Sequence, residues 1–225
     1  MKNIFIIPGY GIPKDILKDE SYRRYLSWVF NQIYQISFES KDEKPVIIFC
    51  GGKTDIFKPY KRTEAEEMKK LFLTWAKRDF VRNQTKDWQY KLDKKSLSTV
   101  ENLLEASKII KRIKGRKQIY IFVEFTRQKK IKKFAQEILK KNFKIIALDF
   151  DLSINRYRDP KLIRKREEID IKLGLNSLKD KKFYQKYRKI LEEKIKFLRR
   201  QGAKKHQDAV YEWWRKKLKE LEKFR

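Results

Sequence analysis

Two polar stretches of this chain have the side chains that a ligand site needs at the start of a helix. Residues 96–102 read Ser-Leu-Ser-Thr-Val-Glu-Asn and lead directly into an apolar helical pattern. Gly51 and Gly52 end an apolar run, and residues 63–68 then read Thr-Glu-Ala-Glu-Glu-Met. Carboxylates placed there suit ribose hydroxyls, a cationic ligand group or acid–base catalysis. We expect the two stretches to face each other across one crevice.

Within that crevice we predict three catalytic candidates and a wider set of ligand contacts. Glu64 and Glu101 are placed near ligand hydroxyls, and Arg127 near an anionic group of the ligand. Glycines after a buried strand let backbone N–H groups approach a ligand closely, and an adjacent lysine can meet a phosphate or carboxylate. The predicted ligand contacts are Gly9, Tyr10, Gly51, Gly52, Lys53, Ser98, Thr99, Asn102 and Glu124.

A purely structural interpretation competes for some of these residues. Ser98-x-x-Glu101 and Thr63-x-x-Glu66 both have capping-box spacing, in which two side chains satisfy free N–H groups at a helix start. Spacing alone favours that interpretation. Glu64 and Asn102 are used by neither box, so they are the stronger candidates for ligand contacts.

Alternating apolar segments predict the fold. Continuous apolar runs typical of buried strands alternate with patterns of helical spacing, which indicates right-handed crossovers in a mainly parallel sheet. We predict a Rossmann-like, doubly wound α/β domain of five strands, whose ligands bind beyond the carboxyl ends of the strands. The predicted strands are 3–7, 45–50, 87–92, 118–123 and 143–148, and the predicted helices are 22–36, 64–78, 99–114 and 131–139.

The composition changes toward the C-terminus, so we predict two domains, 1–152 and 153–225. Beyond Pro160 strand patterns vanish, and apolar residues keep helical spacing. Three roles remain open for these helices: a brace packed on the α/β domain, an arm for a homodimer, or a basic binding surface.

The chain carries 59 basic and 30 acidic residues, a formal charge of +29. Such a charge fits phosphates, nucleic acid or an anionic membrane surface, but a lysine-rich codon bias explains it equally well. An alternative hypothesis is therefore a nucleic-acid-binding module that uses the basic C-terminal helices, with Tyr211, Trp213 and Trp214 as stacking surfaces.

Several kinds of chemistry are excluded or disfavoured by composition. One cysteine, Cys50, excludes an internal disulfide, and with one histidine, His206, a zinc site is not expected. Neither a Walker loop nor a Gly-x-Gly-x-x-Gly fingerprint is present. No run is long and apolar enough to span a bilayer and no leader pattern opens the chain, so we expect a cytoplasmic protein.

The polar stretches, taken in order, resemble the YdcF/SanA/ElyC-like bacterial family, long catalogued as a domain of unknown function. The resemblance covers about residues 3–151 and rests on Gly51 and Gly52, on residues 63–68, and on the Ser-Thr-x-Glu-Asn set at 98–102. It implies a Rossmann-like domain of the soluble YdcF type, S-adenosylmethionine as a candidate cofactor, and a transferase or hydrolase role linked to envelope metabolism. The family's polar residues correspond to Gly51, Gly52, Glu64, Ser98, Thr99, Glu101 and Asn102.

One departure from the family pattern affects the expected chemistry. Many relatives have a histidine and an arginine after the fourth strand, where this chain reads Glu-Phe-Thr-Arg at residues 124–127. We expect Arg127 to take part of that role. We do not expect a mechanism that needs an imidazole base.

Overall fold

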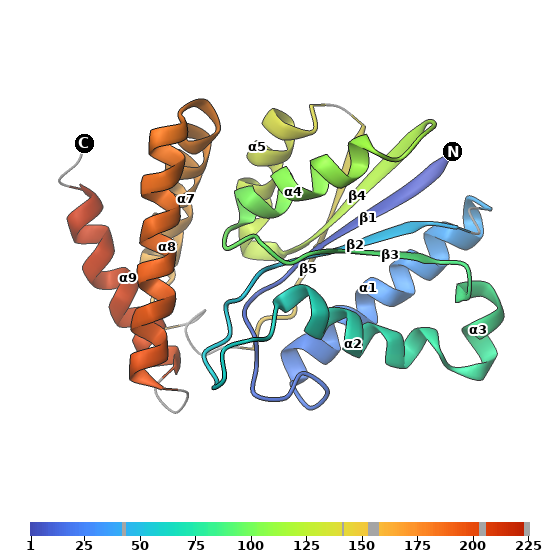
Figure 1. Ribbon diagram of the computed structural model, residues 1–225, viewed down its shortest axis with the longest axis horizontal. Coiled ribbons are helices and arrows are strands. Elements are labelled where there is room, and N and C mark those ends of the chain that lie inside the picture. The colour runs from blue at the N-terminus through green and yellow to red at the C-terminus, as the bar shows by residue number, and fades with distance from the viewer. Residues whose placement is uncertain (42–43, 141, 153–157, 203–205, 223–225) are drawn as a thin grey trace. The chain divides into compact units, whose positions relative to one another are not determined.

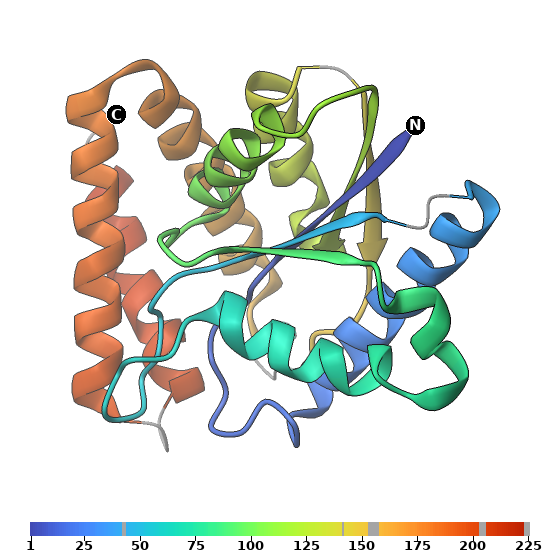
Figure 2. The same ribbon diagram turned by 45° about the vertical axis from the view of Figure 1, so that its right-hand side comes forward.

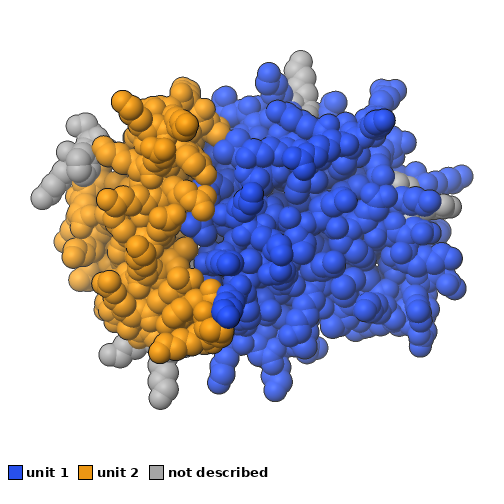
Figure 3. All heavy atoms as spheres, in the orientation of Figure 1, with its two compact units in different colours: residues 1–55, 61–150 blue, residues 56–60, 151–225 orange. Residues whose placement is uncertain are grey.

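The computed structural model of the chain describes residues 1–41, 44–140, 142–152, 158–202 and 206–222. Its contacts divide it into two compact units (Figure 3), unit 1 with Met1–Asp55 and Lys61–Phe150, and unit 2 with Ile56–Tyr60 and Asp151–Arg225. Unit 2 thus combines the C-terminal helices with a short segment that precedes helix α2. The predicted boundary between 152 and 153 falls where the described residues stop.

Unit 1 is built on a five-stranded sheet in which every pair of neighbouring strands is parallel, in the order β3-β2-β1-β4-β5 (Figure 1). Ile6 of the central strand lies opposite Ile48 on one side and Ile121 on the other. The predicted Rossmann-like α/β fold is therefore confirmed. The strands are β1 (Lys2–Pro8), β2 (Val46–Cys50), β3 (Gln89–Asp93), β4 (Lys117–Glu124) and β5 (Phe143–Leu148).

Helices cover both faces of this sheet, with α1 and α2 on one face and α4 and α5 on the other (Figures 1 and 2). This division follows from the strand order, because the chain passes from β1 through β2 to β3 and then returns past β1 to β4 and β5. The helices of unit 1 are α1 (Glu20–Glu39), α2 (Glu64–Ala76), α3 (Asp79–Thr85), α4 (Thr99–Lys111), the 3₁₀ turn η1 (Phe125–Arg127) and α5 (Gln128–Ile138).

The central strands β1 and β2 are mostly hydrophobic, as expected for strands with both faces covered. All five residues of β2 are buried, as are all residues of β1 after Lys2. Phe72 of α2 packs edge-on against Phe49 of β2 and against Phe30 of α1. This aromatic contact fixes helix α2 on the sheet, and with α2 the polar residues at its start.

All four predicted helices differ in extent from the observed ones: α1 and α5 begin earlier than predicted, and α2 and α4 end earlier. The pattern predicted one helix over 64–78, but α2 ends at Ala76, and α3 follows after a turn. The Thr85 hydroxyl donates to the Ala76 carbonyl at 2.6 Å, which satisfies a carbonyl that the ending helix leaves open. Helix α4 ends at Lys111, ahead of Gly115, whose φ of 87° lies in the left-handed region that glycine favours.

The described residues of unit 2 form the helices α7 (Pro160–Lys179), α8 (Lys181–Gln201) and α9 (His206–Glu222). Ile56 is buried against Leu198 and Ala209, and the Arg199 guanidinium stacks over the Tyr60 ring at 4.7 Å. The segment Ile56–Tyr60 is therefore held by side chains of α8 and α9. Among the described residues, no helix is both long and apolar enough to cross a membrane.

Candidate functional site

The carboxyl ends of the parallel strands share one edge of unit 1, and the connections that leave them carry most of the predicted site residues. Gly9 and Tyr10 follow β1, and the two-glycine turn follows β2. Residues 94–98 lead from β3 into α4, and η1 follows β4. The fold thus brings the predicted residues to one edge, as the sequence predicted.

Glu64 lies at the centre of this edge, where it is 7% exposed. Its carboxylate Oε1 accepts from the Gly11 N–H at 3.1 Å and from the Thr54 hydroxyl at 2.5 Å. These two partners belong to the connections after β1 and after β2. Glu64 therefore ties both connections to the first turn of α2.

Gly9 and Gly51 provide the space for the Glu64 side chain. A Cβ placed on Gly9 would lie 2.0 Å from Glu64 Oε2, and one on Gly51 would lie 2.5 Å from the Glu64 Cβ. Gly51 also has a φ of 148°, which L side chains rarely adopt. The requirement for glycine thus comes from a neighbouring carboxylate inside the protein.

The N–H groups of the two-glycine turn are already used within the protein. Gly51 donates to the Asp93 carbonyl at 3.0 Å, and Gly52 donates to the Ser96 carbonyl at 2.6 Å. Their carbonyls accept from Ala65 and Glu64 at 3.1 Å each. The turn therefore links β2, the connection after β3 and the start of α2, whereas the sequence predicted that its N–H groups would meet a ligand.

Asp93 and Ser96 form a second buried polar group, at the end of β3. The Ser96 hydroxyl donates to Asp93 Oδ2, and the Lys95 N–H donates to Asp93 Oδ1 at 2.9 Å. Burial raises the pKa of Asp93 above its ordinary value, although these hydrogen bonds oppose the shift. The pair shapes the turn that delivers the chain to α4.

Helix α4 begins as the capping spacing predicted, with one change of partner. Ser98 is the N-cap, and its hydroxyl accepts from the Glu101 N–H at 3.3 Å. The Glu101 carboxylate accepts from the Leu97 N–H at 2.6 Å, one residue before the cap, and is 3% exposed. Glu101 thus holds the turn before the helix.

Asn102 lies one residue further along α4 and has a different environment. It is 5% exposed, and its side-chain amide oxygen is buried with no hydrogen-bond partner among the residues that the structure describes. Buried polar groups in proteins are almost always paired, and leaving one unpaired costs about 1–3 kcal/mol. This acceptor could therefore take a hydrogen bond from a donor that the described residues do not supply.

Tyr10 lies where the strand order reverses, between the ends of β1 and β4. Its hydroxyl accepts from the Glu124 N–H at 2.8 Å, and the Arg127 guanidinium stacks over its ring at 4.5 Å. The ring also meets Phe150 edge-on at 5.1 Å. In doubly wound sheets a ligand often enters at this reversal. Here the Tyr10 side chain occupies it.

Glu124 and Arg127, both predicted site residues, take part in this arrangement. Glu124 is 2% exposed, and its Oε2 accepts from the Thr126 N–H at 3.0 Å and from the Thr126 hydroxyl. Glu124 therefore caps η1, which presents Arg127 to the Tyr10 ring. Of the other predicted contacts, Lys53 is exposed, and Thr99 is half-buried at the first residue of α4.

Arg62, which no sequence pattern singled out, organises the approach to α2. Its guanidinium forms two bonds of 2.9 Å to the buried Asp55 carboxylate, which raise the pKa of Arg62. It also donates to the carbonyls of Pro13 and Lys14 at 3.1 and 3.2 Å. The sequence signal was an acid and a base seven residues apart, which is too common a pattern to indicate a site.

Comparison of the chain with protein-family models, curated proteins and solved structures gives no match. Within the described ranges, no three side chains of histidine, cysteine, aspartate or glutamate are grouped to hold a metal ion. The chemistry of this site is therefore inferred from the burial and hydrogen bonds of its residues.

Substitution of Gly9 tests the packing around Glu64. Gly9→Ala should lower the free energy of unfolding by about 1–3 kcal/mol, the usual effect of overpacking, because the new Cβ meets Glu64 atoms. In a Glu64→Gly background the same substitution should cost less, since the three atoms nearest to the new Cβ all belong to Glu64. Urea denaturation of the four proteins in this cycle measures both effects, and an equal loss in the two backgrounds would contradict the contact.

The raised pKa of Asp93 predicts a pH dependence of stability. Because the folded state disfavours the charged form, the contribution of Asp93 is fully present below its unfolded pKa of about 4 and is lost as the pH rises through the folded value. Asp93→Asn removes this titration. The free energy of unfolding of the wild type relative to Asp93→Asn should therefore fall between pH 3 and pH 7 in urea denaturation. A constant difference across this range would show that burial does not shift Asp93.

Proposed function

We propose that unit 1 binds a small molecule at the carboxyl edge of its sheet, at the start of α4. The observation that carries this proposal is the buried Asn102 amide oxygen without a hydrogen-bond partner among the described residues. A ligand that donates a hydrogen bond to this oxygen would remove the cost of leaving it unpaired. The start of a helix also offers backbone N–H groups to a ligand.

The acceptor character of the Asn102 amide oxygen favours ligands that carry a hydrogen-bond donor. A hydroxyl or amine of the ligand would pair with its acceptor, as the ribose hydroxyls and the amino group of a nucleotide-like molecule can. The resemblance of residues 51–52, 63–68 and 98–102 to the YdcF/SanA/ElyC-like family supports S-adenosylmethionine as the first molecule to test. It also supports a transferase or hydrolase role linked to envelope metabolism.

The contacts of the two predicted catalytic carboxylates favour positioning over proton transfer. Glu64 Oε1 accepts two hydrogen bonds from the protein, and Glu101 Oε2 accepts one from Leu97. Both side chains are more than nine-tenths buried. We therefore propose that they hold the edge rigid while Asn102 contacts the ligand.

Replacement of Asn102 by leucine gives the clearest test. Thermal-shift measurements and calorimetric titration with S-adenosylmethionine should detect binding to the wild type and none to Asn102→Leu. Without ligand, Asn102→Leu should be as stable as the wild type or more stable, because an unpaired buried acceptor is replaced by an apolar group. This combination of abolished binding and retained stability separates a ligand contact from a folding role.

Asn83→Leu is a matched control, because Asn83 is exposed on α3. It should bind as the wild type does. If Asn102→Leu binds S-adenosylmethionine, nucleotides and nucleotide sugars as well as the wild type does, Asn102 is not the ligand contact. If none of these molecules binds the wild type, the proposed ligand class is wrong.

A second candidate function, binding of nucleic-acid phosphates, is favoured by one surface of unit 2. Lys182, Lys186, Lys189, Lys196 and Arg200 of α8 are all exposed, and their spacing of three, four or seven residues places them on one face of the helix. The aromatic side chains have other contacts. Trp214 is 4% exposed under Arg166 and Lys194, and Trp213 packs against Phe197.

Salt dependence tests this second candidate. The affinity for single-stranded RNA, followed by fluorescence anisotropy, should decrease with salt concentration. Lys182→Ala, Lys186→Ala, Lys189→Ala and Lys196→Ala together should reduce the slope by about 0.7 for each phosphate that the variant no longer neutralises. The control variant makes the same change in net charge at exposed lysines of unit 1, with Lys77→Ala, Lys86→Ala, Lys111→Ala and Lys114→Ala. An equal effect of the two sets would show only the general attraction of a +29 protein for polyanions.

A further inference from the structure

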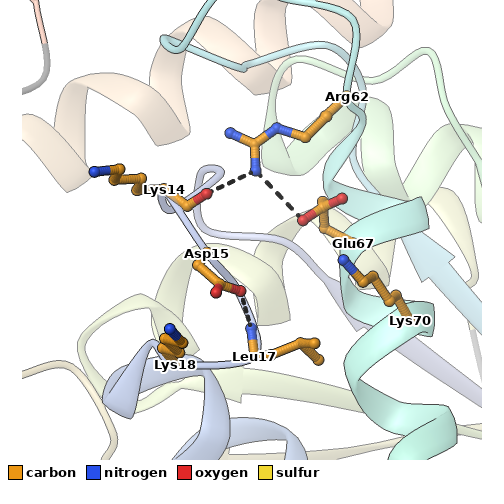
Figure 4. A pocket seen from close by; sticks show the side chains of 7 residues that line it. All are labelled: Lys14, Asp15, Leu17, Lys18, Arg62, Glu67 and Lys70. Carbon is orange, nitrogen blue, oxygen red and sulfur yellow. Dashed lines mark hydrogen bonds and ion pairs between the residues drawn. The ribbon is translucent and has the colours of Figure 1, made fainter.

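A cavity of about 520 Å³ lies in unit 1, outside the residues assigned above to the ligand (Figure 4). Its walls come from the connection between β1 and α1 and from the start of α2. Four of its side chains are basic, Lys14, Lys18, Arg62 and Lys70, and two are acidic, Asp15 and Glu67. Its volume is in the range of small-molecule sites.

The positive charge of this cavity is only partly balanced by its own acids. Asp15 Oδ1 accepts from the Leu17 N–H at 3.0 Å, and Glu67 lies 3.4 Å from an Arg62 nitrogen. Lys14, Lys18 and Lys70 are exposed, and among the described residues none of them has an ion-pair partner. Three lysines on two segments therefore line one hollow, and within the described residues their ammonium groups have no carboxylate partner.

Arg62 holds together the two segments that carry Lys14 and Lys70. Asp55, buried beneath it, holds the guanidinium through two hydrogen bonds of 2.9 Å. The remaining nitrogen, Nη1, donates to the Pro13 carbonyl. It also donates to the Lys14 carbonyl and approaches Glu67 (Figure 4). Because Arg62 fastens the connection that carries Lys14 to the helix that carries Lys70, the cavity exists before any ligand arrives.

We propose that this cavity binds the phosphate group of a small phosphorylated molecule. Lysine ammonium groups act as point charges for phosphate oxygens, and the cavity has room for more than the phosphate itself. Half-buried Leu17 offers apolar contact for the remainder. Neither Asn102 nor any α4 residue lines this cavity, so the site goes beyond the function proposed above.

Calorimetric titration of the full chain with inorganic pyrophosphate, adenosine diphosphate and glucose 6-phosphate tests the proposal. We expect saturable binding at one site. Lys14→Ala, Lys18→Ala and Lys70→Ala together should weaken it roughly tenfold or more, because the variant cannot form the charge-assisted hydrogen bonds. Tighter binding of the organic phosphates than of pyrophosphate would identify a phosphorylated metabolite, and the reverse order would identify a free inorganic anion as the occupant and overturn the small-molecule part.

The control carries alanine at Lys77, Lys86 and Lys111, which are exposed in unit 1 and line no part of this cavity. It should bind as the wild type does, although it loses the same charge. Ligand should also protect Lys14, Lys18 and Lys70 from acetylation, read by mass spectrometry, and leave Lys77 unprotected. Equal weakening in both triple variants, or no saturable binding, would overturn the proposal. Asn102→Leu should leave phosphate binding unchanged, so the two proposed sites are tested independently of each other.

Discussion

The carboxyl edge of unit 1 depends on one buried carboxylate, that of Glu64. It accepts hydrogen bonds from the connections after β1 and β2, and its side chain fills the space that Gly9 and Gly51 leave open. Burial of a carboxyl group that is 7% exposed costs free energy unless the group is hydrogen-bonded. Both connections must therefore keep their conformations for Glu64 to remain buried, which makes this edge rigid.

Most other polar groups of this edge form hydrogen bonds within the protein. Glu101 holds the turn before α4, Glu124 caps η1, and Tyr10 bridges the ends of β1 and β4. Asn102 differs from them because its buried amide oxygen has no partner in the described part of the chain. A rigid edge that carries this acceptor suits recognition of a ligand that presents a donor.

The excess of basic residues is distributed over surfaces with different geometries. On α8 the exposed cations form a row along one helix face, which fits an extended polyanion. In the cavity beside Arg62 they surround a hollow of about 520 Å³, which fits a compact one. Net charge by itself could not separate these cases, since the same composition gives a row on one element and a cluster between two others.

The sequence by itself determined the elements that depend on local patterns. Apolar runs predicted four of the strands, and the alternating pattern of residues 87–92 predicted β3. Ser98 predicted the start of α4, because a cap bonds a residue only three positions away. It did not reveal α3, since the helical spacing continued to Arg78 and gave no sign that α2 ends at Ala76. Only the tertiary structure decided which polar residues are already paired within the protein: the bond from Gly11 to Glu64 joins residues 53 positions apart, and such pairing depends on how the strands and helices pack.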